Sequence, residues 1–134
     1  MKALKDAVFF GLIRDYFNVY LPTQKRVSPN TKRAYQIAME SLLDYTVEHK
    51  HIKLSEVTFE TIDHVLLYDF LNWLEAERHC SISTRNHRLQ CIRAFYAFVA
   101  DTEPTAAVYR DEILKVKPIP AEKQKNIDFM SENA

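Results

Sequence analysis

The sequence predicts an all-α domain, a bundle of four to five helices. Gly11 is the only glycine among 134 residues, and tight hairpins usually need Asn-Gly or Gly-Gly pairs, so an antiparallel β fold is disfavoured. Several segments instead carry apolar residues at intervals of three and four, the spacing of one helix face. A chain of this length can bury a hydrophobic core without disulfides or metal ions, and we expect it to form one domain.

The first expected helix covers about residues 5–21 and stops at Pro22. Its apolar side chains fall on one face: Val8, Phe9, Leu12, Ile13, Tyr16, Phe17 and Tyr20. Such a face normally packs into a core. Its high aromatic content leaves docking against a sister subunit as the alternative.

The second expected helix runs from Pro29 to about His49, with Ser28 as its N-cap and proline at its first position. Its first turn is entirely polar or basic: Asn30, Thr31, Lys32 and Arg33. Lysine and arginine there oppose the helix dipole, so their presence needs another reason. A turn-rich link over residues 54–62 then leads to a third helix from about Asp63 to Arg78, which is apolar over most of its circumference and therefore central.

The fourth expected helix, residues 81–99, repeats this design. Hydroxyl residues open it, namely Ser81, Ser83 and Thr84. Four arginines lie between Arg78 and Arg93, no acid occurs in residues 78–100, and the C-terminal half is apolar and aromatic. A basic helix N-terminus suits phosphate, because its free backbone N–H groups can donate hydrogen bonds to the anion and the positive end of the helix dipole attracts it. We predict that this helix contacts DNA.

A polar stripe on this helix consists of Asn86, Gln90 and Arg93, with Arg85 and Arg88 beside it. Asn and Gln can read adenine and Arg can read guanine in a major groove, whereas flanking arginines suit phosphates. The alternative is a solvated face with one arginine buried against an acid of the third helix.

The formal net charge is zero, but charge is separated along the chain. Residues 24–39 carry four basic side chains and no acid, whereas residues 40–77 carry nine acids against two lysines, a net charge of −7. Residues 78–100 return to +4 and residues 115–125 to +3. A polyanion responds to such local fields more than to the total.

The end of the sequence predicts a short helix at about residues 106–116, capped at Thr105, then an extended linker over residues 117–125. Residues 126–134 restart an apolar pattern, so we expect the sequence to be the front piece of a longer protein. Glycine scarcity excludes Rossmann and Walker phosphate loops. His49 and His51 lack a third ligand, so we expect no metal and no cofactor.

Cys80 and Cys91 form no disulfide framework and no redox motif, which is typical of cytoplasmic thiols. The sequence shows no leader and no run of 18 apolar residues, so we expect neither secretion nor membrane insertion. Nor does any carboxylate pair or nucleophile–base pattern indicate a small-molecule enzyme.

The motifs Ser28-x-Asn30-Thr31-x-x-x-Tyr35, Phe70-Leu71-x-Trp73-Leu74 and Ser81-x-x-Thr84-x-Asn86-x-Arg88-Leu89 occur in this order, the last continuing to Ile92-Arg93-x-Phe95-Tyr96. This pattern resembles the N-terminal core-binding domain of tyrosine recombinases, the phage-integrase family. The resemblance covers about residues 5–118. It implies a SAM-like domain that forms half of a clamp around duplex DNA, and a first helix that contacts other recombinase protomers.

The resemblance implies that the second and fourth helices face the major groove. The residues it indicates are Ser28, Asn30, Thr31, Lys32, Arg33, Thr84, Arg85, Asn86, Arg88, Gln90 and Arg93. We expect residues 1–118 to be the DNA-binding domain and residues 119–134 to be an interdomain linker and the start of a catalytic domain. A helical protein-interaction module without a DNA role is the competing hypothesis.

The resemblance also implies which catalytic groups this sequence lacks. Family catalysis uses a tyrosine nucleophile supported by arginines, a lysine and a His-x-x-Arg motif. The residues three past each histidine are Ile52, Leu54, Leu67, Ile82 and Gln90, none of them arginine. We therefore expect this chain not to cleave DNA by itself.

Overall fold

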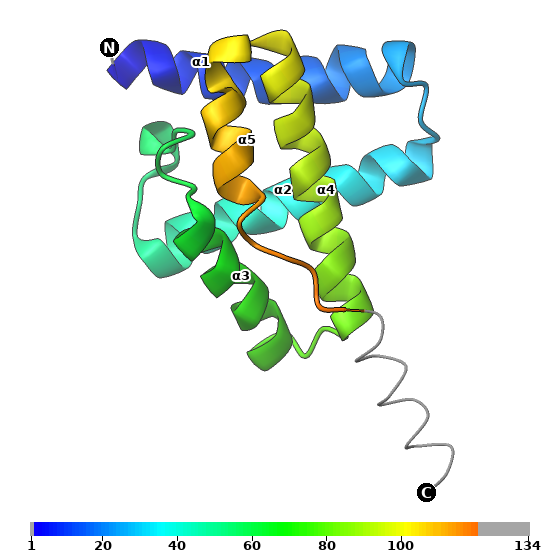
Figure 1. Cartoon of the computed structure of the whole chain (residues 1–134), viewed down its shortest axis with the longest axis vertical. Helices are drawn as coiled ribbons and strands as arrows, with labels where there is room; N and C mark the ends of the chain where they lie inside the picture. The colour runs from blue at the N-terminus through cyan, green and yellow to red at the C-terminus, as the bar shows by residue number, and fades with distance from the viewer. Residues whose placement is uncertain (1, 121–134) are drawn as a thin grey trace, which may run out of the picture.

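The computed structural model of the protein describes residues 2–120, and that part of the chain folds into helices without any strand (Figure 1). The α-helices are α1 (Lys2–Asp15), α2 (Pro29–Lys50), α3 (His64–Ala76), α4 (Ile82–Thr102) and α5 (Ala107–Ile113). This confirms the all-α prediction. No helix in the described range is long and apolar enough to cross a membrane.

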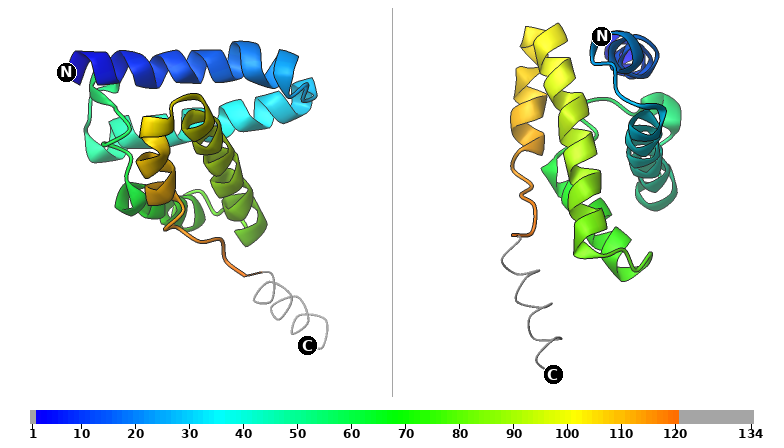
Figure 2. Two further views of the ribbon diagram at one scale, coloured as in Figure 1. Left: turned by 45° about the horizontal axis from the view of Figure 1, so that its top comes forward. Right: turned by 90° about the vertical axis from the view of Figure 1, so that its right-hand side faces the viewer.

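The helices form two layers around one core. α1 and α2 run in opposite directions, and α4 crosses them with α5 at its side, as the views in Figures 1 and 2 show. Aromatic rings fill the space between the layers. Phe9 meets Phe95 edge-on with ring centroids 6.4 Å apart, and Tyr16 meets Phe95 at 5.3 Å. Edge-on aromatic packing of this kind fixes how the helices cross.

The first helix does not stop at Pro22 as predicted. After α1 the chain continues as a π-helix, Tyr16–Gln24, with Pro22 inside it. Proline clashes with the carbonyl of the residue four positions earlier in an α-helix, and a wider π turn leaves room for its ring. The segment ends at Gln24, and the backbone N–H of the next residue, Lys25, bonds the Tyr20 carbonyl at 2.8 Å.

The predicted boundaries of the other long helices are confirmed to within a few residues. α2 begins after Ser28, and α4 begins after Ser81. α3 begins after Asp63, whose Oδ1 accepts a hydrogen bond from Leu66 N at 2.9 Å. Thr58 and Thr61 bond each other within the preceding turn, at 3.1 and 3.3 Å.

The last helix is shorter than predicted. Pro104–Ala106 form a 3-10 turn, and α5 follows with Ala106 at its cap position and no side-chain cap. The predicted cap at Thr105 is therefore wrong, because Pro104 starts the turn one residue earlier. After α5 the chain leaves the helix and runs beside α4 toward its first turns (Figure 1). Of the linker that was expected over residues 117–125, residues 117–120 are described and form neither helix nor strand. The rest of that linker and the new domain start expected at residues 126–134 lie outside the described residues.

Candidate nucleic-acid interface

The N-terminal ends of α2 and α4 are built in the same way. Ser28 Oγ accepts the backbone N–H of Thr31 at 3.1 Å, and Ser81 Oγ accepts that of Thr84 at 3.1 Å. In each pair the serine hydroxyl also contacts the threonine Oγ1, at 3.0 and 3.1 Å. This reciprocal Ser-x-x-Thr cap satisfies a donor that the first helical turn would leave unpaired.

A groove lies between the N-terminal halves of these two helices. Its lining residues are Ala34 and Ile37 from α2, and Ser83, Thr84, His87 and Arg88 from α4. The α2 wall is apolar, whereas the α4 wall is polar and carries the guanidinium of Arg88. The two helices that were predicted to contact DNA therefore share one continuous surface.

Most of the predicted residues on this surface are reachable by a ligand. Ser28, Asn30, Arg33 and Gln90 are exposed, and Thr31, Lys32, Thr84 and Arg88 are partly exposed. Arg33 has only a loose ion pair with Glu40, at 3.7 Å and with both side chains more than 60% exposed. Such a pair contributes little and does not prevent the arginine from binding an anion.

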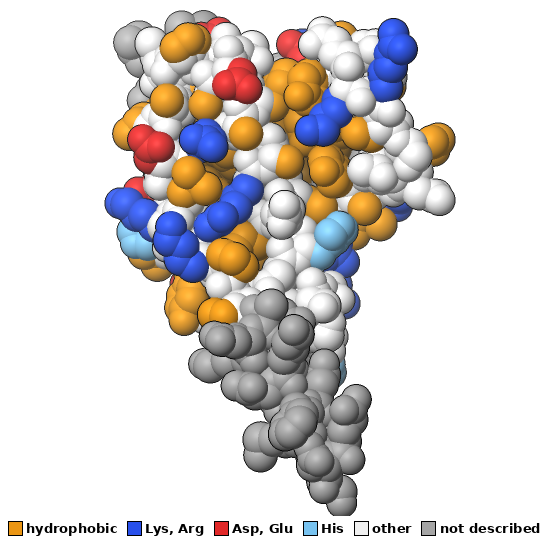
Figure 3. Space-filling model, turned by 45° about the vertical axis from the view of Figure 1, so that its right-hand side comes forward, with side chains coloured by type: hydrophobic (Ala, Val, Ile, Leu, Met, Phe, Trp, Pro, Cys, Tyr) orange, Lys and Arg blue, Asp and Glu red, His pale blue; other side chains and the backbone are white. Residues whose placement is uncertain are grey.

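Sequence reasoning missed His87 and Ser83, which also line the groove. Ser83 precedes His87 by four residues, as Thr84 precedes Arg88, so the four lie together on one side of α4. That helical spacing was the available signal. Figure 3 shows one face of the molecule, on which Lys and Arg side chains are interleaved with hydrophobic ones.

Arg85 does not face solvent, which corrects the prediction that it contacts a phosphate. Its side chain is 3% exposed, and its Nε lies 2.6 Å from Glu75 Oε1 on α3. Its Nη2 donates to Asn72 Oδ1 at 3.3 Å. The alternative interpretation, an arginine buried against an acid of the third helix, is thus realised at this position. Arg85 joins α3 to the first turns of α4.

Asn86 and Arg93 do not form a solvent-facing stripe with Gln90, which is a second correction. Asn86 Nδ2 donates to the Ile119 carbonyl at 2.9 Å, and Asn86 Oδ1 accepts from Ile119 N at 2.9 Å. Arg93 Nη2 donates to the carbonyls of Leu114 and Val116, at 3.5 and 2.5 Å. Of the three stripe residues only Gln90 projects from the protein surface.

Acidic side chains limit the surface along α2. Glu40, Asp44 and Glu48 follow one another at helical spacing and line a neighbouring hollow with Trp73 and Arg78. A polyanion is repelled by such a row of carboxylates. The favourable surface is therefore confined to the N-terminal part of α2 and the adjoining turns of α4.

The site offers no reactive thiol and no metal centre. Burial raises the pKa of Cys91 to about 11, so this thiol stays protonated at neutral pH despite its position 3.8 Å from His87 Nε2. Within residues 2–120, no group of three His, Cys, Asp or Glu side chains is placed to hold a metal ion.

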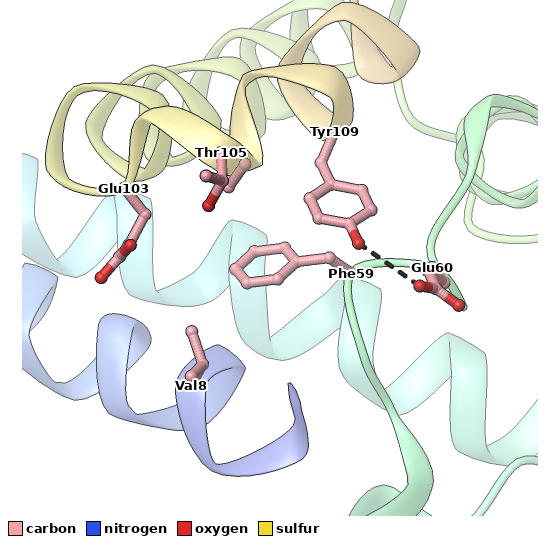
Figure 4. A pocket seen from close by; sticks show the side chains of 7 residues that line it. Val8, Phe59, Glu60, Glu103, Thr105 and Tyr109 are labelled. Atoms are coloured by element: carbon pink, nitrogen blue, oxygen red, sulfur yellow. Dashed lines mark hydrogen bonds between the residues drawn. The ribbon is translucent and has the colours of Figure 1, made fainter. Parts of the chain in front are cut away.

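A separate hollow between α1 and α5 is apolar with an acidic rim (Figure 4). Phe59 stacks on Tyr109 with centroids 5.2 Å apart, and Tyr109 donates to Glu60 Oε1 at 3.4 Å. Val8 and Glu103 complete it from the opposite side. None of its lining residues is shared with the groove between α2 and α4.

Comparison with known proteins agrees with this architecture. The family described as “Phage integrase, N-terminal SAM-like domain” matches residues 14–103. “Putative integrase/recombinase y4rD” of Sinorhizobium fredii is 30% identical over 105 residues, which are 78% of this chain and 37% of that protein. “Putative integrase/recombinase y4rC” of the same organism is 29% identical over 112 residues, 84% of this chain and 34% of that protein. The chain thus spans about a third of the length of these relatives. No solved structure matches.

Proposed function

Because this chain belongs to the phage integrase N-terminal SAM-like domain family, we propose that it binds duplex DNA as one part of a site-specific recombinase. The observation that carries the proposal is the groove between α2 and α4, which Arg88 lines; the two helices begin with matching caps, and Lys32 and Arg33 lie near the start of α2. Lys and Arg at helix N-termini oppose the dipole, and a phosphate placed between them removes that conflict.

The contacts divide into two groups by chemistry. Lys32, Arg33 and Arg88 are the accessible cations, so they bind phosphates and set the register of the domain on DNA. Ser28, Asn30, Thr31 and Thr84 surround them with polar groups of the helix starts. Gln90 is exposed and can present its amide to an adenine edge, and His87 lies on the same face.

The remainder of the reaction belongs to chain outside this sequence. The matched relatives are about three times as long as the aligned region, and their further length offers room for strand cleavage and rejoining. In this proposal the domain holds one side of a recombination site, and other recombinase protomers occupy the neighbouring sites on the same DNA.

The proposal is tested by fluorescence anisotropy with a labelled duplex of about 20–30 base pairs over a salt series. We expect log Kd to vary with log salt with a slope of about 3, because Lys32, Arg33 and Arg88 would each neutralise one phosphate and each neutralised phosphate contributes about 0.9. Lys32→Ala and Arg88→Ala should each lower that slope by about one. Arg110→Ala, an exposed arginine on α5 away from the groove, is the matched control and should leave it unchanged.

The competing function is a helical protein-interaction module. Equal losses for Arg88→Ala and Arg110→Ala would show that binding is diffuse and would favour that alternative. Absence of binding at low salt, in a protein that melts cooperatively, would exclude this domain as an independent DNA-binding unit.

A further inference from the structure

The residues that follow α5 do not leave the domain directly. Residues 114–119, which we name the strap, continue in the direction of α5 and run beside α4 toward its N-terminal end (Figure 1). Ile113 and Val116 are buried in the core, and Ile119 is partly buried. The strap is therefore packed against the bundle and joined to it at two places.

The first of these is Arg93, near the middle of α4. The last carbonyls of a helix lack intrahelical donors, and a cation close to them is favourable. Arg93 supplies both the hydrogen-bond donor and the positive charge, because its Nη2 donates to the carbonyl of Leu114 at the end of α5 and to that of Val116. One arginine thus holds the point at which α5 turns into the strap.

The second is Asn86, two turns closer to the start of α4. Its side-chain amide pairs with both backbone groups of Ile119, each bond being 2.9 Å long. Reading an adenine would use the same two atoms, the amide oxygen and the amide nitrogen. Asn86 can hold the strap or read a base, but it cannot do both at once.

We propose that Asn86 and Arg93 are positioning residues that hold the strap and deliver the following chain beside the DNA-contacting face of α4. The role of the strap beside DNA rests on the proposed function, whereas its contacts with Asn86 and Arg93 do not. Successive residues of an α-helix are about 100° apart, so Asn86 and Arg93 share one side of α4. Gln90 and His87 lie between that side and the groove residues Thr84 and Arg88.

In the proposed recombinase, this placement gives the strap a definite role. If the chain were free from Val116 onward, the linker could reach a wide volume around the domain. Because Asn86 holds Ile119, the linker begins at the edge of the proposed DNA-contacting face. Fixing a tether at one end raises the effective concentration of whatever it carries near that point. The two halves of a clamp would thereby close on the same stretch of DNA.

The test uses amide hydrogen exchange of the full 134-residue chain, read at Ile119 by NMR. We expect the Ile119 amide to exchange at least about tenfold more slowly than an unprotected amide, and Asn86→Ala to remove that protection. Trypsin cleavage after Lys115, which also lies in the strap, should accelerate as well; Lys117 is not a trypsin site, because Pro118 follows it. Gln90→Ala, on the same helix but without a strap contact, is the control and should change neither. Unprotected exchange at Ile119 in the unsubstituted protein would overturn the proposal.

Addition of duplex DNA separates this inference from the proposed function. If DNA binds and Ile119 stays protected, the strap is held in the complex as we propose. If DNA binds and Ile119 loses its protection, Asn86 has left the strap, and the positioning role is refuted although DNA binding is upheld. If DNA does not bind, the proposed function fails, while the effect of Asn86→Ala on the free protein still decides whether the strap is held.

Discussion

Arg85 on α4 and Glu75 on α3 form an ion pair in which the arginine is almost completely buried, with Nε 2.6 Å from Oε1. The guanidinium also lies over the ring of Tyr68, 6.0 Å from its centroid. This pair fixes the angle between α3 and the first turns of α4, and so fixes one wall of the groove. Arg85 supports the proposed DNA surface from behind rather than contributing to it.

The first prediction tests whether Arg85 stabilises the fold or contacts DNA. Arg85→Ala should lower the free energy of unfolding by about 2–3 kcal/mol, since it removes a packed side chain and the partner of Glu75. The slope of DNA affinity against salt should not change, in contrast to Arg88→Ala. Urea denaturation measures the first quantity and the anisotropy series the second. A reduced salt slope for a stably folded Arg85→Ala protein would return Arg85 to the phosphate contacts.

Replacing both partners of the ion pair, Arg85 by methionine and Glu75 by glutamine, should change stability much less than Arg85→Ala does. Nε and Nη1 of Arg85 have no hydrogen-bond partner within the described residues, although Nε lies 2.6 Å from Glu75 Oε1, so the buried charge is incompletely compensated. Well-packed apolar residues often replace buried ion pairs without loss. The double substitution Arg85→Met with Glu75→Gln, which removes both charges, should therefore leave the free energy of unfolding within about 1 kcal/mol of that of the unsubstituted protein. A loss as large as that of Arg85→Ala would show that the ion pair itself stabilises the fold.

The two helix caps give a second prediction. Ser28→Ala and Ser81→Ala should each destabilise the domain by about 1 kcal/mol, because each leaves a first-turn backbone N–H without its acceptor. Thermal denaturation followed by circular dichroism measures the loss. Ser55→Ala is the matched control, as Ser55 is exposed and lies in a short 3-10 turn. A change at Ser55 equal to those at the caps would mean that the loss is not specific to capping.

The caps of α2 and α4, most helix boundaries and the core follow from local sequence signals, so they could be predicted. Ser28-Pro29 and Ser81 mark helix starts by chemistry that acts within three residues. The destinations of Arg85, Asn86 and Arg93 could not be predicted in this way. Their partners Glu75, Ile119 and Val116 come from other segments, and only the tertiary fold brings them within hydrogen-bonding distance. Pro22 was misjudged because a π-helix can accommodate a proline that ends an α-helix.

The third prediction concerns the aromatic core. Phe95 is fully buried and meets the rings of Phe9, Tyr16 and Tyr96, so Phe95→Ala should cost about 3–5 kcal/mol. Trp73 is only partly buried, at the edge of the hollow lined by α2 acids, so Trp73→Ala should cost less. Chemical denaturation of both variants gives the comparison. If Trp73→Ala lowered the free energy of unfolding as much as Phe95→Ala or more, the centre of the core would lie nearer α3 than the packing indicates.

The fourth prediction is a pH dependence that arises where α5 meets the start of α3. Glu112 accepts hydrogen bonds from the His64 backbone N–H at 3.0 Å and from the His64 ring, and it pairs with Lys115 at 2.9 Å. These donors, the His64 backbone first, lower the pKa of Glu112 from 4.5 to about 2. The folded state therefore binds this proton less readily than the unfolded state does.

A carboxyl group whose pKa is lowered in the folded state stabilises the fold at pH values above its pKa in the unfolded state. This contribution is lost as the pH falls. The stability from Glu112 should thus be complete above about pH 5 and should decline between pH 4.5 and about 2. Allowing for solvent screening of a partly exposed group, we expect about 1 kcal/mol. Glu112→Gln should flatten this part of the curve of melting temperature against pH, whereas Asp111→Asn, an exposed neighbour, should not. Curves for Glu112→Gln and the unsubstituted protein that run parallel from pH 5 to pH 2 would show that Glu112 does not couple α5 to α3.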